Sequence, residues 1–299
     1  VQLETTVNGR MYGVGLVARP KGVIYNLDMF EEYGLEVPTT YTEFIQVCDF
    51  FMEKGIYPLM HAYAYIYAPF TEHDSFFPSM ALYYGEGDLL SNVQYNGAKL
   101  SESQSFLKSM EIYGKLVSYQ DPNDFGIDQA RSYELFAAGE RPMFVYGGWI
   151  IGEVQANNPD GRFGIFAFPW SDNPDDNTLV VGLDCGYLVN AKSKHLDEAV
   201  SFVEYLTTPE AGEIQIRNTG LMSSVLGVDY PADSSAYITE FSGYIESGKT
   251  AAKWMVPEMT GQYSSVYRSK LQEFASLPEA DRDPAAFILG MDEELDAID

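Results

Sequence analysis

Cysteine and histidine are scarce in this sequence, which limits the covalent and metal chemistry open to the protein. Its 299 residues include two cysteines, Cys48 and Cys185, and three histidines, His61, His73 and His195. The cysteines share no C-x-x-C pattern, and Cys48 falls on an apolar position of an expected helix, so we interpret it as a small buried hydrophobic residue. No two histidines stand at the spacing of metal ligands. We therefore expect neither a metal site nor a cofactor.

Positive charge and long apolar runs are also in short supply. The chain has 18 Lys and Arg residues against 44 Asp and Glu residues, a formal net charge of −26. Because nucleic-acid affinity comes mostly from Lys and Arg displacing counterions, we expect no nucleic-acid partner. No stretch approaches the roughly 18 apolar residues that cross a bilayer, and no basic-then-apolar signal peptide opens the sequence. These absences leave a cytosolic protein and a mature or truncated secreted one both open.

The common signatures of nucleotide-binding and hydrolytic enzymes are missing. The stretch YGVGLVA (Tyr12–Ala18) has the spacing of a dinucleotide-binding loop, but Arg19-Pro20 prevents the helix that such a loop must open. There is no G-x-x-x-x-G-K-[ST], G-x-S-x-G or H-E-x-x-H motif. Asp184 and Glu153 could be drawn as a glycosidase pair. Among 44 carboxylates some pair can always be proposed, so we interpret these acids as solvated surface groups.

What the sequence does contain is a regular succession of strand-like and helix-like segments. Strands alternating with helices predict an α/β protein with mostly parallel sheets flanked by helices, and the length suggests two lobes. The clearest element begins at TYTE, where Thr40 and Glu43 form a capping box ahead of a helix that ends at Gly55. We expect strands at 11–18, 22–25, 58–60, 142–146, 163–168 and 179–190, and further helices at 28–33, 103–117, 128–138, 149–156, 196–206, 209–217, 234–246, 261–274 and 284–297.

Aromatic residues gather in two places. In FAAGERPMFVYGGW (Phe136–Trp149) an apolar strand ends at two glycines and Trp149, whose ring is either packed in a core or displayed to a ligand. In HAYAYIYAPFTEHDSFF, Tyr63, Tyr65 and Tyr67 alternate, so they share one face if the segment is extended. Three buried phenols would each need a hydrogen-bond partner, whereas a sugar offers C–H faces to the rings and hydroxyls to the phenols. Ordinary packing and a ligand pocket both remain open for this run.

Three blocks, in order along nearly the whole chain, carry a family resemblance. They are NGRMYGVGLVARPKGVIYNLDMFEEYGLEVPTTYTEF (Asn8–Phe44), FAAGERPMFVYGGW, and LVVGLDCGYLVNAKSKHLDEAVSFVEYLTTPEAGEIQIRNTG (Leu179–Gly220). Together they resemble the extracellular solute-binding proteins of ABC importers, in the branch that contains maltose-binding protein. The resemblance implies a periplasmic-binding-protein-like two-lobe clamp that holds its ligand in an inter-lobe cleft and closes by hinge bending.

The resemblance also implies ligand-binding residues. The family's tryptophan after the strand stacks on the sugar, which carries over to Trp149, with Gly148 leaving room for ring and ligand. Arg19 and Asp184 mark the two crossings between the lobes.

Aromatic positions of the family carry over to two further places in this chain. An aromatic after the second strand block corresponds to Tyr63, Tyr65 and Tyr67. An aromatic at the start of a C-terminal helix corresponds to Tyr263, with Arg268 as a weaker candidate.

Two departures from the family pattern concern the domains. The chain reads GLMSS (Gly220–Ser224) where the family often shows G-x-x-P, and it begins partway into the pattern. The resemblance implies about three βα units upstream, on the order of 90 residues, with a signal segment and a lipoprotein cysteine before them. On this mapping 1–18 and 186–227 are the remnant of an N-terminal lobe, too small for its own core, while 19–183 and 228–299 form the C-terminal lobe.

The function implied by the resemblance is the oligosaccharide-binding component of an ABC importer. Such a protein is an extracytoplasmic monomer that presents its closed form to membrane permease subunits and catalyses nothing. One alternative is a binding protein for a metal or a polyamine, since relatives of the iron-binding type use adjacent tyrosines and Tyr83-Tyr84 is such a pair. A second alternative is a carbohydrate-active enzyme.

Overall fold

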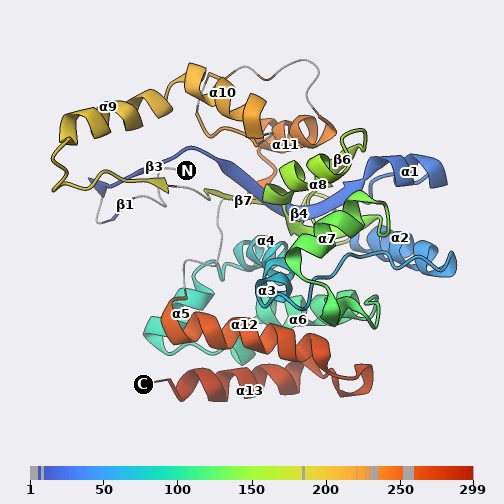
Figure 1. Ribbon diagram of the computed structural model, residues 1–299. Coiled ribbons are helices and arrows are strands. Elements are labelled where there is room, and N and C mark those ends of the chain that lie inside the picture. The colour runs from blue at the N-terminus through green and yellow to red at the C-terminus, as the bar shows by residue number, and fades with distance from the viewer. Residues whose placement is uncertain are drawn as a thin grey trace.

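The structure, a computed structural model, describes residues 6–7, 10–183, 186–219, 221–225, 227–228, 230, 235–251 and 259–298. Its larger part is a five-stranded sheet covered by helices on both faces, and a smaller group of short strands and two helices extends to one side (Figure 1). The strands are β1 (Thr6–Val7), β2 (Arg10–Met11), β3 (Val14–Gly15), β4 (Ala18–Asn26), β5 (Met143–Gly147), β6 (Phe163–Phe166), β7 (Leu179–Leu183), β8 (Gly186–Tyr187) and β9 (Thr250–Ala251). The α-helices are α1 (Leu27–Tyr33), α2 (Tyr41–Glu53), α3 (Tyr67–Asp74), α4 (Phe77–Tyr83), α5 (Leu89–Asn96), α6 (Gln104–Val117), α7 (Gln129–Ala137), α8 (Ile151–Asn157), α9 (Leu196–Leu206), α10 (Pro209–Thr219), α11 (Ala236–Ser247), α12 (Gly261–Ser276) and α13 (Pro284–Asp296). Short 3-10 helices are η1 (Leu100–Glu102), η2 (Asp124–Gly126), η3 (Gly148–Ile150) and η5 (Glu279–Asp281).

Strand β4 is the centre of the main sheet. It pairs antiparallel with β5 on one side and with β6 and β7 on the other, and only the β7–β9 pair of this sheet is parallel. The α/β architecture with flanking helices is confirmed, but the expectation of mostly parallel strands is wrong for this sheet. The prediction assumed that each helix carries the chain back to a strand of the same direction. Instead β4 runs unbroken through Pro20, and the strands that follow return beside it in the opposite direction.

The two faces of the sheet carry separate cores because successive side chains of a strand point to opposite faces. Val23 and Tyr25 of β4 join the core built with α2, α4, α6, α12 and α13, whereas Ile24 joins the core built with α7, α8 and α11. Gly22 is required where β6 approaches, since a Cβ there would lie 2.5 Å from the Phe166 carbonyl oxygen. Cys48 is fully buried in the first core, as the sequence predicts.

The predicted capping box of α2 is present. The Thr40 side chain accepts a hydrogen bond from the Glu43 backbone N–H, and the Glu43 carboxylate accepts one in return from the Thr40 N–H. Gly55 follows the helix with a φ of 75°, the left-handed conformation expected of a residue that ends a helix.

The smaller group comprises the β1–β2 and β3–β8 pairs with α9 and α10 (Figure 1). It joins the main body beside β4, where the Ala18 N–H donates to the Met222 carbonyl and the Ser224 N–H donates to the Leu16 carbonyl, both at 3.1 Å. Helix α9 contains no buried residue, and Phe202 on it is 59% exposed. The apolar side of α9 is therefore uncovered in this chain.

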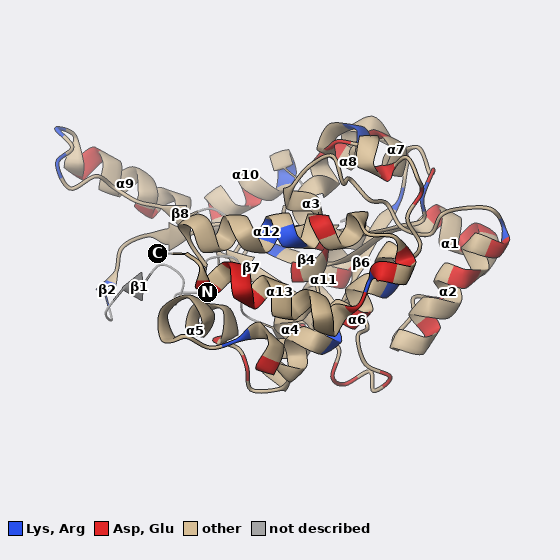
Figure 2. Cartoon of the chain, turned by 90° about the horizontal axis from the view of Figure 1, so that it is seen from below, with Lys and Arg blue, Asp and Glu red and all other residues tan. Residues whose placement is uncertain are grey.

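The negative charge is distributed over the molecule. Asp and Glu residues appear on helices throughout the fold, among them α1, α2, α8 and α9, and do not gather at one end (Figure 2). Diffuse charge of this kind favours solubility and does not mark a binding surface. Within the described part of the chain, no helix combines the length and the apolar character needed to cross a membrane.

Helix α3 is unusual because it is polar and yet buried. Every residue from Ala68 to Asp74 is buried, and four consecutive ones carry polar side chains, each with a partner on a different element. These pairs are Thr71 with Tyr146 of β5, Glu72 with Tyr63 and His61, His73 with Ser109 of α6 and Tyr267 of α12, and Asp74 with Lys21 of β4.

The partners of His73 fix the protonation state of its ring. The Ser109 hydroxyl donates to the Phe106 carbonyl, so it accepts from His73 Nε2–H at 2.8 Å, and the Tyr267 hydroxyl donates to His73 Nδ1 at 3.1 Å. A doubly protonated ring would require the Tyr267 hydroxyl to accept instead of donate and would place a positive charge in a fully buried site. Burial lowers the pKa of His73 to about 3.

We predict that His73→Gln makes the protein less sensitive to acid. A histidine whose pKa falls on folding contributes stability above its unfolded pKa of about 6.5 and loses it as pH falls toward the folded value. With a folded pKa of about 3, the wild type should lose about 2 kcal/mol more than His73→Gln between about pH 7.5 and about pH 5. Urea unfolding of both proteins at the two pH values measures this difference. Equal losses would show that the buried ring accepts a proton freely.

Candidate ligand-binding site

Trp149 lies just after β5, half-buried, beside an aromatic ring and a cation. The Tyr146 ring is 5.5 Å away, centroid to centroid, and Lys21 Nζ lies 5.8 Å from the indole centroid. The indole N–H donates to the Tyr133 hydroxyl, which also accepts from Gln129 Nε2 at 2.6 Å. The ring is thus held in one orientation by polar contacts and is not sealed among aliphatic side chains.

The two glycines before Trp149 have separate roles. The indole folds back over Gly147, where any Cβ would overlap it, and Gly147 faces Lys21 across the sheet. A Cβ on Gly148 would instead overlap the Tyr237 side chain of α11. The expectation that Gly148 leaves room for a ligand is therefore wrong in its reason, because a protein side chain fills that space.

The tyrosine run does not form the extended face that its alternation predicts. Residues 61–66 form turns and α3 begins at Tyr67. Tyr63 turns into the core, where it is 1% exposed and donates its hydroxyl proton to Glu72 Oε2 at 3.1 Å, so it is removed from the set of candidate ligand contacts. Tyr65 is half-buried and Tyr67 is 43% exposed, with their rings 5.3 Å apart.

Helix α12 contributes Arg268 to this pair of tyrosines. Its guanidinium lies 4.7 Å from the centroid of the Tyr67 ring, a cation–π contact. Tyr263, the stronger candidate from the sequence, is half-buried on another side of α12 and faces α5 and α13 beside Asp292. The structure therefore brings Arg268 to the tyrosines and leaves Tyr263 apart.

Of the two residues expected at the crossings between the lobes, the structure describes Arg19 and does not describe Asp184. Arg19 lies near the Gly148 end of the sheet, close enough to Tyr237 for its charge to lower the pKa of that phenol, although burial raises that pKa by more. Asp184, together with Cys185 and Gly220, lies outside the described residues.

We refer to Trp149, Tyr133, Tyr146, Tyr65 and Tyr67 together as the aromatic band. Tyr65 lies near the phenols of Tyr133 and Tyr146, both of which contact Trp149. Burial raises the pKa of Tyr133 to about 12, so this phenol is protonated near neutral pH and can donate a hydrogen bond. Tyr133 and Tyr146 are 8% and 1% exposed, so they support Trp149 from within the fold. The half-buried Trp149, Tyr65 and Arg268 and the exposed Tyr67 can stack on and hydrogen-bond a polyhydroxylated ligand.

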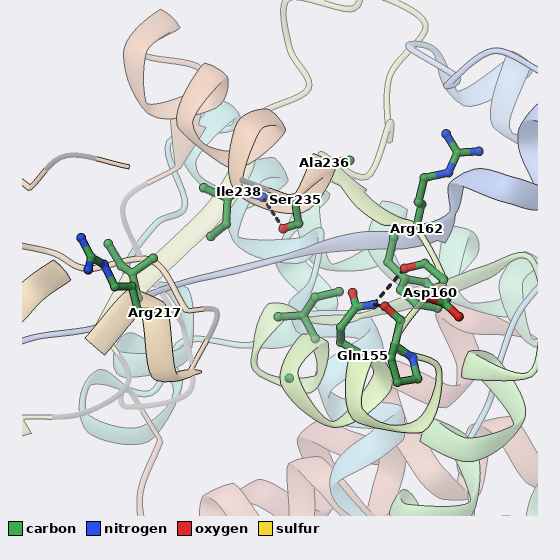
Figure 3. A pocket seen from close by; sticks show the side chains of 13 residues that line it. Gln155, Asp160, Arg162, Arg217, Ser235, Ala236 and Ile238 are labelled. Carbon is green, nitrogen blue, oxygen red and sulfur yellow. Dashed lines mark hydrogen bonds between the residues drawn. The ribbon is translucent and has the colours of Figure 1, made fainter. Parts of the chain in front are cut away.

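A large cavity lies elsewhere. A cavity of about 620 Å³ lies between α8, α10 and α11 and is open to solvent on one side, with Ile151, Phe163, Ile216 and Ile238 in its lining (Figure 3). Two of its polar side chains are engaged with the protein. Gln155 Nε2 donates to the carbonyls of residues 158, 159 and 161, and Arg162 pairs with two acids of α1. Volume alone would favour this cavity, but chemistry that can recognise a polar ligand is concentrated in the aromatic band.

Comparisons with known proteins agree on the family. The family model described as bacterial extracellular solute-binding protein matches residues 2–240. The chain belongs to the bacterial extracellular solute-binding proteins.

Two curated relatives of this solute-binding protein are named for sugars. The multiple sugar-binding protein of Streptococcus mutans is 29% identical over 75% of this chain and 54% of its own length. The melibiose/raffinose/stachyose-binding protein MelE of Bacillus subtilis is 24% identical over 74% of this chain and 52% of its own length. The chain thus spans about half the length of these relatives.

Solved structures show the same fold. RafE in complex with raffinose superposes with a TM-score of 0.80 at 24% identity, covering 98% of this chain and 74% of that one. A chitin oligosaccharide binding protein gives 0.80 at 17% identity, covering 99% and 74%. These neighbours confirm the predicted fold class, a two-lobe solute-binding fold of flanked sheets.

The residues considered for metal binding and for glycosidase activity lie on different elements of this solute-binding protein. Tyr83 and Tyr84 pack against Trp170, with centroid distances of 5.1 and 6.2 Å, and the described residues contain no group of three or more His, Cys, Asp and Glu side chains placed to hold a metal ion. Glu153 is exposed on α8.

Sequence reasoning missed Lys21 and Tyr133 as neighbours of Trp149, and Tyr237 as the neighbour of Gly148. Lys21 left a signal, since it is a charged residue within the apolar strand RPKGVIY, two positions from Arg19 and therefore on the same face. Tyr133 and Tyr237 come from α7 and α11, and no local pattern connects those helices to the end of β5.

We predict that Gly148→Ala lowers the free energy of unfolding by about 1–3 kcal/mol, the usual cost of overpacking. The added methyl overlaps the Tyr237 side chain. Adding Tyr237→Leu should recover part of the loss, because a shorter side chain vacates the space. Urea unfolding of the two single variants and the double variant gives the coupling, and strictly additive losses would show that Tyr237 is not what occupies the position.

Proposed function

We propose that this solute-binding protein captures an oligosaccharide at the aromatic band around Trp149 and delivers it to an ABC importer. The observation that carries the proposal is the band itself: an indole with phenols along it and Arg268 at the Tyr67 end. Sugars present C–H faces that pack on aromatic rings and hydroxyls that pair with phenols and guanidinium groups. The names of the two curated relatives support a sugar over other solutes.

The proposed mechanism is hinge closure of two lobes over the sugar. We assign 19–183 and 228–299 to one lobe, which carries the band, and 1–18 and 186–227 to the other. The division is supported by the junction at Ala18 and Met222, where few backbone bonds join the smaller group to the main body. Arg19 stands directly beside this junction at the start of β4, and we propose that it, with Asp184, meets the ligand from the hinge side.

The proposed setting follows from the family. We infer an extracytoplasmic monomer, held at the cell surface or in the periplasm, whose closed form docks on the permease subunits of the importer. No covalent step is part of this function. The band supports that view, because burial raises the pKa values of Tyr65, Tyr133 and Tyr146, so these phenols do not act as nucleophiles near neutral pH.

Trp149→Ala should weaken sugar binding strongly. Isothermal titration against raffinose, stachyose and chitin oligosaccharides should find one saturable ligand. The loss of a stacked indole should cost about 1.5–3 kcal/mol, or about 10- to 100-fold in affinity. A parallel chromatographic assay should find every sugar unchanged after long incubation.

Trp170→Phe is the matched control. Trp170 is a buried tryptophan that donates its indole N–H to Ser79 within the first core, so this variant should lose stability and keep its affinity. Equal affinity in wild type and Trp149→Ala would contradict the proposed site. Release of shorter sugars would instead support the enzyme alternative.

A further inference from the structure

Helix α3 touches both halves of the proposed site, and only its first residue reaches the ligand face. Its eight residues begin at Tyr67, whose ring is part of the band, and continue into the buried stretch that ends at Asp74. The two charged residues of this stretch, Glu72 and Asp74, are 4% and 2% exposed. A buried charge is costly unless it is paired and hydrogen-bonded, so the position of each partner is tightly determined.

Asp74 acts toward Trp149 through Lys21. The two form an ion pair with both side chains almost fully buried. Lys21 Nζ lies between two rings, 5.7 Å from the Phe70 centroid and 5.8 Å from the Trp149 centroid. Lys21 is the cross-strand partner of Gly147, and the indole of Trp149 covers Gly147. The Lys21 ammonium group and the indole therefore lie close together at this end of the sheet. Asp74 therefore fixes the cation that supports the ring.

Glu72 acts toward the tyrosine loop. Its Oε2 atom accepts from the Tyr63 hydroxyl at 3.1 Å and contacts His61 Nδ1 at 3.2 Å, and the His61 and Tyr63 rings stack at 4.8 Å. Gln272 of α12 donates to the Tyr63 carbonyl at 2.7 Å. Tyr63 is thus anchored at both its side chain and its backbone, two residues before Tyr65 and four before Tyr67.

We propose that Asp74 and Glu72 are positioning residues that set the distance between the two stacking surfaces of the site. Asp74 holds Trp149 through Lys21, and Glu72 holds the Tyr65–Tyr67 pair through Tyr63. Neither acid contacts the sugar. The inference rests on the proposed function, and it adds that the spacing between indole and tyrosines, and hence the length of sugar accepted, is set by one buried helix.

The test is a pair of crossed double-mutant cycles on the purified protein, with raffinose or the tightest-binding sugar of the panel above. Asp74→Asn should lower affinity about tenfold in the wild type and by less than about twofold in Trp149→Ala, because its effect passes through the indole. In Tyr67→Ala it should still lower affinity about tenfold. Glu72→Ala should show the reverse pattern, losing its effect in Tyr67→Ala and keeping it in Trp149→Ala, and Glu72→Gln should restore most of the affinity by accepting from Tyr63 again.

Two further variants keep the test decisive if a buried charge cannot be left unpaired. The double replacement Lys21→Met with Asp74→Leu removes both charges while keeping the side-chain volume. Proteins often tolerate such a replacement of a buried ion pair. It should weaken sugar binding in the wild type and have little effect in Trp149→Ala. His73→Gln is the matched control, since it alters the same helix at a residue bonded to α6 and α12. It should leave affinity unchanged.

The outcomes separate this inference from the proposed function. If Trp149→Ala and Tyr67→Ala both bind sugar as the wild type does, the proposed site itself is wrong. If they weaken binding while the Asp74 and Glu72 variants lose the same affinity in every background, the site stands and the positioning role is overturned. Equal losses in His73→Gln would likewise overturn it, because they would reflect general loosening of α3.

Discussion

The burial of four consecutive polar side chains on α3 is the constraint that the rest of the site depends on. Leaving any one of them without a partner would cost about 1–3 kcal/mol, and more for the two carboxylates. Each has a partner on a different element: β5 for Thr71, the 61–66 segment for Glu72, α6 and α12 for His73, and β4 for Asp74, although Glu72 Oε1 is buried without a hydrogen bond among the described residues. Through Thr71, Glu72 and Asp74, a single short helix thereby fixes the relative positions of the segments that carry the aromatic rings, while His73 holds the helix to α6 and α12.

The band follows from that arrangement together with two glycines. Gly147 lets the indole lie across the end of the sheet, and Gly148 admits Tyr237 from the opposite face. The indole of Trp149 therefore lies against the buried ammonium group of Lys21 and donates its N–H to Tyr133. An indole held in this way loses little conformational freedom when a ligand stacks on it. This favours affinity, because the entropy cost of ordering the side chain is met on folding and not on binding. A binding protein needs this rigidity within a lobe, while motion is reserved for the hinge.

Local chemistry made part of this predictable. The capping box of α2, the burial of Cys48 and the strand that ends at Trp149 were all readable, because each depends on residues within a few positions of one another. The family match and the two-lobe fold were also correctly predicted from blocks of sequence in register.

The predictions that failed share one physical cause, because each depends on contacts between residues far apart in the sequence. The alternation of tyrosines predicted one exposed face, but Glu72 draws Tyr63 into the core and α3 begins at Tyr67. Parallel strands were predicted from the alternation of helices and strands, but β4 enters the main sheet from the smaller group and pairs antiparallel with β5 and β7. The pairs that matter most, Lys21 with Asp74 and His73 with Tyr267, lie 53 and 194 residues apart, so no window along the chain reveals them.

The central claim, that the aromatic band and not the larger cavity holds the sugar, is tested most directly by a crystal structure of the protein soaked with raffinose at several times its dissociation constant. The account predicts a sugar ring stacked on Trp149 with another unit reaching toward Tyr67 and Arg268. A sugar bound instead between α8, α10 and α11, with the indole of Trp149 uncovered, would contradict it.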